Sequence, residues 1–354
     1  MLFSRAEMDI LRLCALCKDL PLDTVPEVVC YLAKYKFLRI SRCGCSYRLT
    51  PRGYLVLQKA GYDCKPDRQY LGQGAALCRR LQTAATTTFF WRYGADVFSD
   101  TVPAKMDRPV FLPSFVYRRN PSTNFLGATR MDGFFYTADT VWIPYTITPE
   151  SERIYADAEQ RVFRSNLVLQ GKSPAVLYIG TGSYEQLVTS VAAPRAKNIH
   201  AADTYREALS KFACPSALIT MDDVGMHQLQ ILSAPHYAER LLRAALGSDY
   251  TPVAKPGIDG QSRSAGEPYI VGIDGNFVRF ADLAAQCRNT LHILLLPSHI
   301  EAVGRYLCGQ NVCLHPVEPS VAEFVLGLPD IPPPLRQEPY QNAKGEYAYV
   351  PFVR

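Results

Sequence analysis

Residues 47–57 read YRLTPRGYLVL and join a strand to a helix. The strand, residues 46–50, alternates polar and apolar side chains, as a half-buried hairpin strand does. Thr50 precedes a proline, which is favoured in the first turn of a helix because its missing N–H costs nothing there. We expect this helix to end at Gly61 and to bury its apolar side, formed by Tyr54, Leu55, Leu57 and Ala60.

The segments before this stretch predict the rest of a small domain. Residues 37–41 (FLRIS) predict a first hairpin strand, and residues 42–45 (RCGC) predict a tight turn. Residues 4–7 (SRAE) and 24–27 (TVPE) both have the pattern of a helix capping box. Apolar residues follow each box at helical spacing. We therefore expect one helix over residues 4–18 and a second that starts at the later box.

The order helix, helix, hairpin, helix is that of a winged helix-turn-helix, which we expect in residues 1–65. The stretch 47–57 resembles the Y-x-L-T-x-x-G-x-x-x-L segment of winged-helix regulators and replication-associated proteins. The resemblance implies binding to double-stranded DNA. One difference is the short loop at residues 19–23, which stands where a winged helix has its middle helix. That helix is either one turn long or lost.

The charge of this region supports the same interpretation. Six cations and no carboxylate lie between Lys34 and Arg52, and cations beside the grooves of a duplex contact its phosphates. A run of charge can also be a solvated face, and some winged helices only dock proteins. The candidate DNA-binding residues are Tyr31, Lys34, Lys36, Arg39, Arg42, Arg48 and Arg52.

Composition bounds the class of protein. The chain has 354 residues, 48% hydrophobic and 20% charged, so it can bury a sizeable core. Its net charge of +5 permits an anionic partner without requiring one. We expect the winged helix at 1–65, a linker at 66–78, an α/β domain at 79–328 and a Pro-rich extended tail at 329–354.

Eleven cysteines are scattered along the chain without a secretory signal or a long apolar run. We therefore expect reduced thiols, a cytoplasmic protein and no membrane partner. Cys14, Cys17, Cys43 and Cys45 could form a four-thiolate zinc site. However, Cys14 and Cys17 are needed in the apolar stripe of their helix, so we expect no metal and no cofactor.

The larger domain reads as helix, three strands, helix, strand, at about residues 75–96, 111–118, 129–136, 141–147, 149–166 and 174–179. This order is similar to the core of the restriction-endonuclease-like fold. Residues 130–136 (RMDGFFY) and 141–145 (VWIPY) resemble the replication-relaxation family of plasmids and integrative elements, in which a winged helix precedes such a domain. The resemblance implies an α/β fold with a mixed sheet.

The chemistry of such nucleases requires two acids and a lysine around Mg²⁺. Asp132 occupies the position of the first acid, but residues 142–146 (WIPYT) contain no acid and no lysine. Glu150 or Glu152 could replace the missing acid, with Arg153 in place of the lysine. Acids in a first helical turn are already explained by the helix dipole. We therefore expect a fold without catalysis, with Asp132 and Glu152 as weak catalytic candidates.

The C-terminal half carries no diagnostic motif. Residues 228–232 predict a strand, and residues 269–280 predict a hairpin around Asp274-Gly275, which explains Asp274 without chemistry. Gly180 and Gly182 predict a packing turn rather than a phosphate site. The histidines His292, His299 and His315 lack metal-ligand spacing in the chain.

Together these features predict a DNA-binding protein of a plasmid or integrative element with a non-catalytic nuclease-like domain. Its expected partners are double-stranded DNA and a protein partner or homodimer. Two alternatives stay open: a Mg²⁺-dependent nuclease that uses Asp132 with Glu150 or Glu152, and a transcriptional regulator that senses a ligand.

Overall fold

The computed structural model describes residues 2–24, 26–64, 74–118, 129–148, 159–193, 203–212, 214–329, 338–342 and 344–347. The chain forms two compact units: unit 1 is Met1–Pro121 with Ile331–Arg354, and unit 2 is Ser122–Asp330. Both contain helices and sheets, which confirms the α/β class. The division lies well beyond the end of the expected winged helix at residue 65, and a helix begins at Ala75, inside the expected linker.

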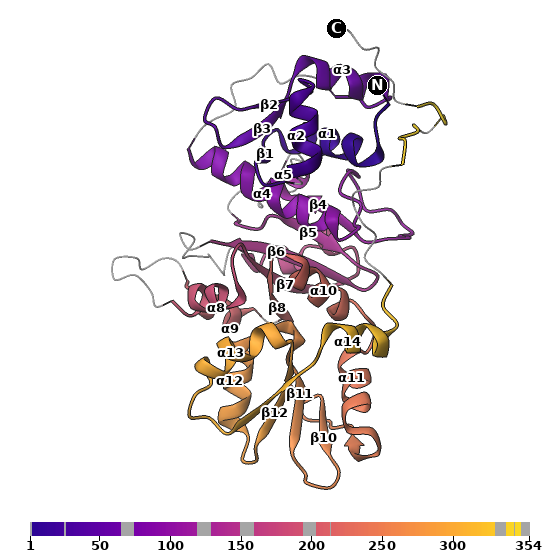
Figure 1. The fold of residues 1–354 in the computed structure, drawn as a ribbon. Coiled ribbons are helices and arrows are strands. Elements are labelled where there is room, and N and C mark those ends of the chain that lie inside the picture. Colours follow the sequence, from indigo (N-terminus) through magenta and orange to yellow (C-terminus); the bar gives the residue numbers. More distant parts are fainter. Residues whose placement is uncertain are drawn as a thin grey trace. The chain divides into compact units, whose positions relative to one another are not determined.

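Unit 1 opens with the predicted helices and hairpin (Figure 1). Its three-stranded antiparallel sheet has the order β1-β3-β2. The strand β1 lies in the expected 19–23 loop and pairs Leu20 with Tyr47 of β3. The elements are α1 (Arg5–Cys17), β1 (Leu20–Pro21), α2 (Pro26–Lys34), β2 (Leu38–Ile40), β3 (Ser46–Leu49) and α3 (Pro51–Lys59).

The helix α1 begins where its sequence predicts. The Ser4 hydroxyl accepts from the Glu7 backbone N–H at 3.2 Å, and the Glu7 carboxylate accepts from the Ser4 N–H at 2.6 Å. These two bonds satisfy donors that a helix end leaves unpaired. The helix buries one side, formed by Ala6, Met8, Ile10, Leu11, Leu13, Cys14 and Cys17.

The motif at residues 50–53 fixes how α3 follows the hairpin. The Thr50 hydroxyl caps α3 by accepting from the Gly53 N–H, and the Thr50 backbone N–H donates to the carbonyl of Phe37 at 3.0 Å. A Cβ at Gly53 would lie 2.5 Å from that same carbonyl oxygen. Glycine is therefore required because backbone from the start of the hairpin passes directly against α3.

The rest of unit 1 comes from both ends of the chain. The helix α4 (Ala75–Arg92) packs on α1 and β1, and β4 (Val110–Pro113) is followed by α5 (Ser114–Arg118). The strand expected over 111–118 is therefore only half as long, and a short helix takes its second part. The Tyr340 N–H donates to the Phe3 carbonyl at 2.8 Å, so part of the Pro-rich tail returns to the N-terminus.

Unit 2 begins with strands in the order β5-β6-β7-β8. The strand β5 is antiparallel to β6, whereas β6, β7 and β8 run parallel. The expected strand at 228–232 is wrong: Asp222 caps a helix by accepting from the Gly225 N–H, and that helix continues through Leu232. The elements are β5 (Gly133–Tyr136), β6 (Thr140–Ile147), η2 (Val162–Arg164), α7 (Asn166–Leu169), β7 (Ser173–Gly180), α8 (Tyr184–Ala192), α9 (Tyr205–Lys211), β8 (Ser216–Thr220) and α10 (Asp223–Leu232).

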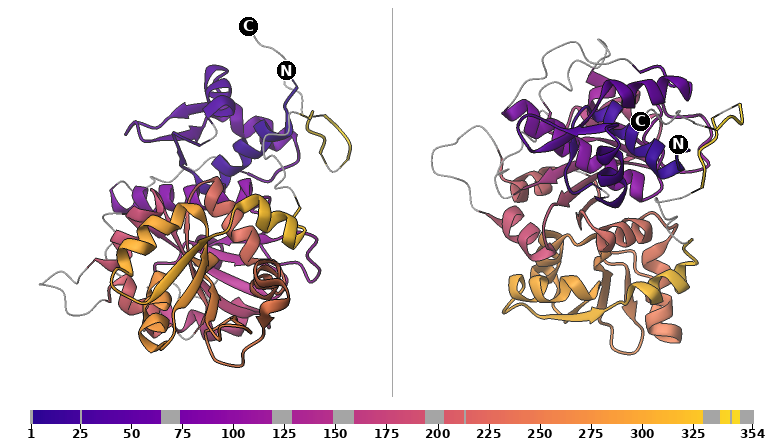
Figure 2. Two further views of the ribbon diagram at one scale, coloured as in Figure 1. Left: turned by 60° about the horizontal axis from the view of Figure 1, so that its bottom comes forward. Right: turned by 45° about the horizontal axis from the view of Figure 1, so that its top comes forward.

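A second sheet in unit 2 has the order β13-β12-β11-β10-β9, with β11, β12 and β13 parallel. Figures 1 and 2 show α11 and α14 on one face of this sheet and α12 and α13 on the other. The elements are α11 (Tyr237–Leu246), η3 (Gly247–Asp249), β9 (Tyr250–Thr251), β10 (Gly260–Ser262), β11 (Pro268–Val271), η4 (Gly272–Asp274), α12 (Phe277–Gln286), β12 (Leu291–Leu295), α13 (Pro297–Tyr306), β13 (Val312–Pro316) and α14 (Pro319–Leu326).

The hairpin expected around Asp274-Gly275 is also wrong. Gly275 has φ 64°, as expected of a turn glycine, but Asn276 then caps α12 by accepting from the Arg279 N–H. The apolar residues read as a second strand are instead one face of this helix.

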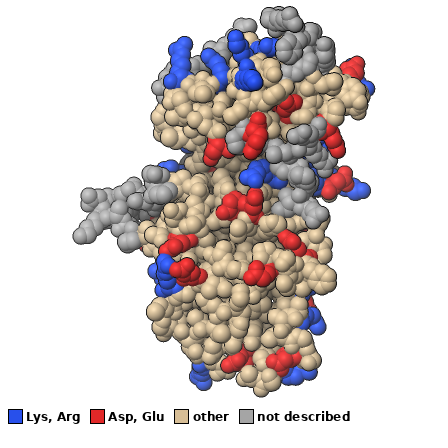
Figure 3. Space-filling model, in the orientation of Figure 1, with Lys and Arg blue, Asp and Glu red and all other residues tan. Residues whose placement is uncertain are grey.

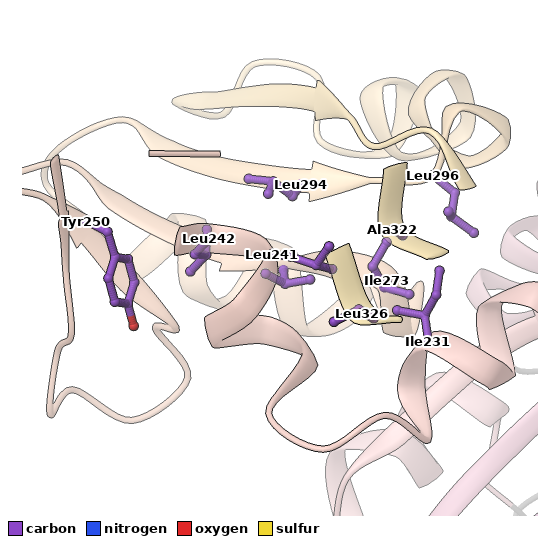
Figure 4. Close-up of a cluster of buried hydrophobic side chains, with 10 residues drawn as sticks. Ile231, Leu241, Leu242, Tyr250, Ile273, Leu294, Leu296, Ala322 and Leu326 are labelled. Atoms are coloured by element: carbon purple, nitrogen blue, oxygen red, sulfur yellow. The ribbon is translucent and has the colours of Figure 1, made fainter. Parts of the chain in front are cut away.

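The face of the second sheet opposite α12 and α13 packs against α10, α11 and α14 through side chains that include Leu241, Leu242 and Leu294 (Figure 4). Each such leucine stabilises the unit by about 1.5–3 kcal/mol.

Candidate nucleic-acid interface

Four of the predicted DNA-binding cations are exposed on unit 1: Lys34, Lys36, Arg39 and Arg42. Within the described residues none of them takes part in an ion pair. Figure 3 shows Lys and Arg side chains standing together over the part of unit 1 where Figure 1 places β2 and α3. Their charge is available to a partner from solution.

The alternation of the hairpin explains why Arg39 points outward. Leu38 and Leu49 are buried and lie opposite each other across β2 and β3. The next pair, Arg39 and Arg48, therefore falls on the opposite face of the sheet. Ile40 follows at the strand end and is 56% exposed. The hairpin tip thus presents cations and one apolar side chain.

Arg48 differs from the other cations because it has a buried partner. Its guanidinium donates to both oxygens of Asp19, at 2.7 and 3.1 Å, and Arg80 of α4 donates to the same carboxylate at 2.8 Å. Asp19 is fully buried. The sequence interpretation did not foresee this partner of Arg48, because no acid lies nearby in the chain.

The Asp19 carboxylate is held in its charged form. Burial raises the pKa of this group, but hydrogen bonds from Arg48, Ser46 and Arg80 outweigh the burial, so the net pKa lies below its usual value. The Ser46 hydroxyl contributes a bond of 2.7 Å. The three donors come from β3 and α4, so Asp19 fastens the hairpin to the body of unit 1.

Arg52 is half-buried, and Tyr31 is partly exposed. The Arg52 guanidinium lies over the Phe37 ring, 4.7 Å from its centroid, and donates to the Tyr35 carbonyl at 3.4 Å. Tyr31 is 39% exposed on α2 and its ring contacts that of Tyr35 with centroids 4.7 Å apart. Arg52 therefore packs against the hairpin base, while Tyr31 offers part of an aromatic face.

The four cysteines considered for a zinc site occupy different environments. Cys14 and Cys17 are buried in α1, whereas Cys43 and Cys45 are exposed in the hairpin turn. The Cys14 thiol donates to the Tyr47 carbonyl at 3.6 Å, and burial raises the pKa of Cys17 to about 12. Both α1 thiols therefore stay protonated and act as core side chains.

Asp132, the candidate nuclease acid, lies immediately before β5 and is buried. Its Oδ2 accepts from both the backbone N–H and the hydroxyl of Thr146, each at 2.7 Å, and its own N–H donates to the Pro144 carbonyl. These bonds give the acid a structural role between β5 and β6. Glu150, Glu152 and Arg153, its suggested partners, lie outside the described residues.

A further buried acid was missed by the sequence interpretation. Glu159 is fully buried and accepts from the Tyr145 hydroxyl at 2.8 Å and from the Arg130 backbone N–H at 2.6 Å. The only sequence signal was its position in the segment that follows β6. Its carboxylate thus links β6 to the residues just before β5, close to the bonds made by Asp132.

The expected packing turn after β7 agrees with the geometry there. A Cβ at Gly180 would lie 3.0 Å from the Leu187 Cβ, so β7 and α8 approach closely at this point. Ser183 and Gln186 form a capping box at the start of α8. Two of the donors that a phosphate would need are therefore already paired.

Unit 2 also contains a pocket of about 490 Å³ whose lining includes Asp259, Asp274 and Arg279. Asp274 forms an ion pair of 2.9 Å with Arg279, and Asp259 accepts from the Val271 N–H at 2.7 Å. Burial raises the pKa of Asp274, although the charge of Arg279 acts in the opposite direction. The acid that sequence analysis explained as a turn residue is thus part of a cavity wall.

No family model, curated protein or solved structure matches this chain. Within the described ranges, no helix combines the length and the apolar character needed to cross a bilayer. The case for function therefore depends on the geometry of the chain itself.

Proposed function

We propose that residues 2–64 form a winged helix that binds double-stranded DNA through the edge made by α2 and the β2–β3 hairpin. The observation that carries this proposal is the set of four exposed cations, Lys34, Lys36, Arg39 and Arg42, without ion pairs in the described part of the chain. The strand β1 supports it, because it pairs with β3 on the side away from β2 and completes a three-stranded sheet behind the hairpin.

Phosphate contacts account for the expected binding. Each cation that neutralises a phosphate releases a condensed counterion, which lowers log K by about 0.9 for every tenfold rise in salt. Four such cations predict a slope of about −3.6 and a dissociation constant in the micromolar range or weaker. Contacts of this kind position a protein on DNA without selecting a sequence.

Two of the seven predicted residues receive smaller roles. Arg48 is bound by Asp19, so replacing it would disturb the hairpin as well as remove a charge. Arg52 packs on Phe37 at the hairpin base. A test of DNA binding is therefore sharper on Lys36, Arg39 and Arg42, whose side chains make no such contacts within the described residues.

The experiment measures fluorescence anisotropy of a labelled random duplex over a range of salt concentrations. The triple variant Lys36→Ala, Arg39→Ala and Arg42→Ala is expected to bind more weakly, with a salt slope reduced by about 2.7. The matched control carries Lys255→Ala, Arg263→Ala and Arg288→Ala, which removes the same charge from exposed positions of unit 2.

Two results would contradict the proposal. One is equal weakening in the two triple variants, which would mean that only net charge matters. The other is a triple hairpin variant that binds with the affinity and salt slope of the parent protein. Circular dichroism on each variant establishes that the fold is retained.

We also propose a relation to the replication-relaxation family. In this chain the order helix, strand, helix, hairpin, helix precedes an α/β unit. This order fits that of replication-relaxation proteins, and such a relation would imply a role on a plasmid or integrative element. We propose no catalytic step, because the Oδ2 atom of Asp132 is engaged by Thr146. A protein partner or a homodimer stays a prediction.

A further inference from the structure

Two histidines and a cysteine that are far apart in the chain meet on the second sheet of unit 2. His292 lies on β12, and Cys313 and His315 lie on β13. The strands are parallel, with His292 opposite Cys313. Residues i and i+2 of a strand share a face, so His315 lies on that face too. One ligand atom from each of the three side chains lies within 4.8 Å of the others.

Hydrogen bonds orient the rings. The Nε2 atom of His292 lies 2.9 Å from a carboxylate oxygen of Glu267, and its Nδ1 atom lies 2.8 Å from Nε2 of His315. A carboxylate only accepts, so Nε2 of His292 carries a hydrogen, and in the neutral ring Nδ1 presents a lone pair. A carboxylate that holds the far nitrogen of a histidine in this way is the usual support of a metal ligand.

The His292 ring is mostly shielded from solvent. The Tyr269 ring stacks on His292 with centroids 4.4 Å apart, and the His292 side chain is 12% exposed. The Cys313 thiol makes no hydrogen bond to any residue that the structure describes.

We propose that His292, Cys313 and His315 bind a zinc ion, with Glu267 positioning His292 through its far nitrogen. Two imidazoles and a thiolate are a donor set that suits Zn²⁺. Tetrahedral zinc at about 2.0–2.1 Å from each nitrogen requires nitrogens about 3.3 Å apart. The two rings therefore separate by about 0.5 Å when the ion enters.

Three protein ligands leave one tetrahedral position open. Sites of this kind keep a water or another ligand at that position. Binding releases the thiol proton of Cys313 to solvent as the thiolate binds the metal, and the hydrogen of His315 moves from Nε2 to Nδ1. The proposal is independent of the DNA-binding one, since it concerns a different unit of the chain.

The experiment titrates Co²⁺ into the reduced, metal-free full-length protein and records the absorption spectrum. Expected are one high-affinity equivalent per chain, visible bands of tetrahedral Co²⁺ and a thiolate charge-transfer band, all removed by one equivalent of Zn²⁺. Cys313→Ser is expected to abolish the charge-transfer band. Glu267→Gln is expected to weaken binding about 10–100-fold.

The control is Cys308→Ser, which removes an exposed thiol nearby in the chain and is expected to leave the spectrum unchanged. A spectrum that keeps its charge-transfer band in Cys313→Ser, or that loses it equally in Cys308→Ser, would overturn the proposal. So would the absence of a tight first equivalent; the residues would then form only a hydrogen-bonded chain from Glu267 to His315.

Discussion

A buried histidine in unit 2 gives the most quantitative prediction. His299 lies in α13 with no exposed surface, and its ring stacks on Tyr184 with centroids 3.7 Å apart. Neither ring nitrogen has a hydrogen-bond partner within the described residues. Burial alone lowers the pKa of His299 to about 3, because the imidazolium form would lose its hydration without gaining a partner.

The sign and size of the effect follow from linkage. A histidine in the unfolded chain has a pKa of about 6.5, so below that pH the unfolded chain binds a proton that the folded chain does not bind. The free energy of unfolding therefore falls as the pH drops from about 6.5 towards 3. With these two pKa values, His299 alone costs about 2 kcal/mol at pH 5 relative to pH 7.

The assay compares urea unfolding of the parent protein with that of His299→Phe and His299→Leu at pH 7 and pH 5. Both variants remove the titrating ring, so each is expected to lose about 2 kcal/mol less than the parent over this interval. Using two replacements separates titration from packing, since only packing differs between them. A difference between parent and variants that stays constant from pH 7 to pH 5 would refute the reasoning.

Two further stability predictions concern unit 1. Asp19→Asn is expected to lower the free energy of unfolding, measured in urea, by about 3 kcal/mol, because it leaves Arg48 and Arg80 without their buried anion. The control Asp23→Asn, which replaces an exposed acid, is expected to change this free energy by less than about 0.5 kcal/mol. Since the pKa of Asp19 lies below its usual value, its contribution to the free energy of unfolding is present above about pH 4 and is lost as the pH falls below that. Equal losses of stability in Asp19→Asn and Asp23→Asn would contradict this account. Gly53→Ala is expected to lower the melting temperature and cost about 1–3 kcal/mol, although alanine favours helices, because its Cβ would meet the Phe37 carbonyl. Gly304→Ala in α13, where the new Cβ meets only ordinary contacts, is expected to stabilise by up to about 1 kcal/mol, and a gain at both positions would show that the close approach at Gly53 is not limiting.

Local signals in the sequence were sufficient for most of unit 1. The capping box at Ser4 and Glu7 and the proline after Thr50 each act within a few residues, and each begins a helix as predicted. Periodicity failed at residues 228–232 and 276–280, where short apolar runs fit a strand or a helix equally well. In both places a capping side chain, Asp222 or Asn276, determines the outcome.

Charge was harder to interpret than secondary structure. Lys34 to Arg52 contains no acid, so the whole run looked exposed. The acid that binds Arg48 is Asp19, 29 positions away in the chain, and it becomes a neighbour only because β1 pairs with β3. A two-residue strand is too short to show an alternating pattern, so no local signal marked it. Hence the exposed cations could be predicted as a group, but Arg48 could not be separated from them.

The same limit explains why the histidine and cysteine cluster was overlooked. Metal motifs recognised in sequences place their ligands on one helix or in one loop, where spacing along the chain equals proximity in space. His292 and Cys313 are 21 positions apart and are brought together by the register of two parallel strands. A register is set by the helix between the strands, here α13, and by the core on both faces. The informative local signal was therefore Cys313-x-His315, since alternate residues of any strand share a face whatever the register. Such a pair next to a histidine on a neighbouring parallel strand is a pattern that can be searched for before a structure is known.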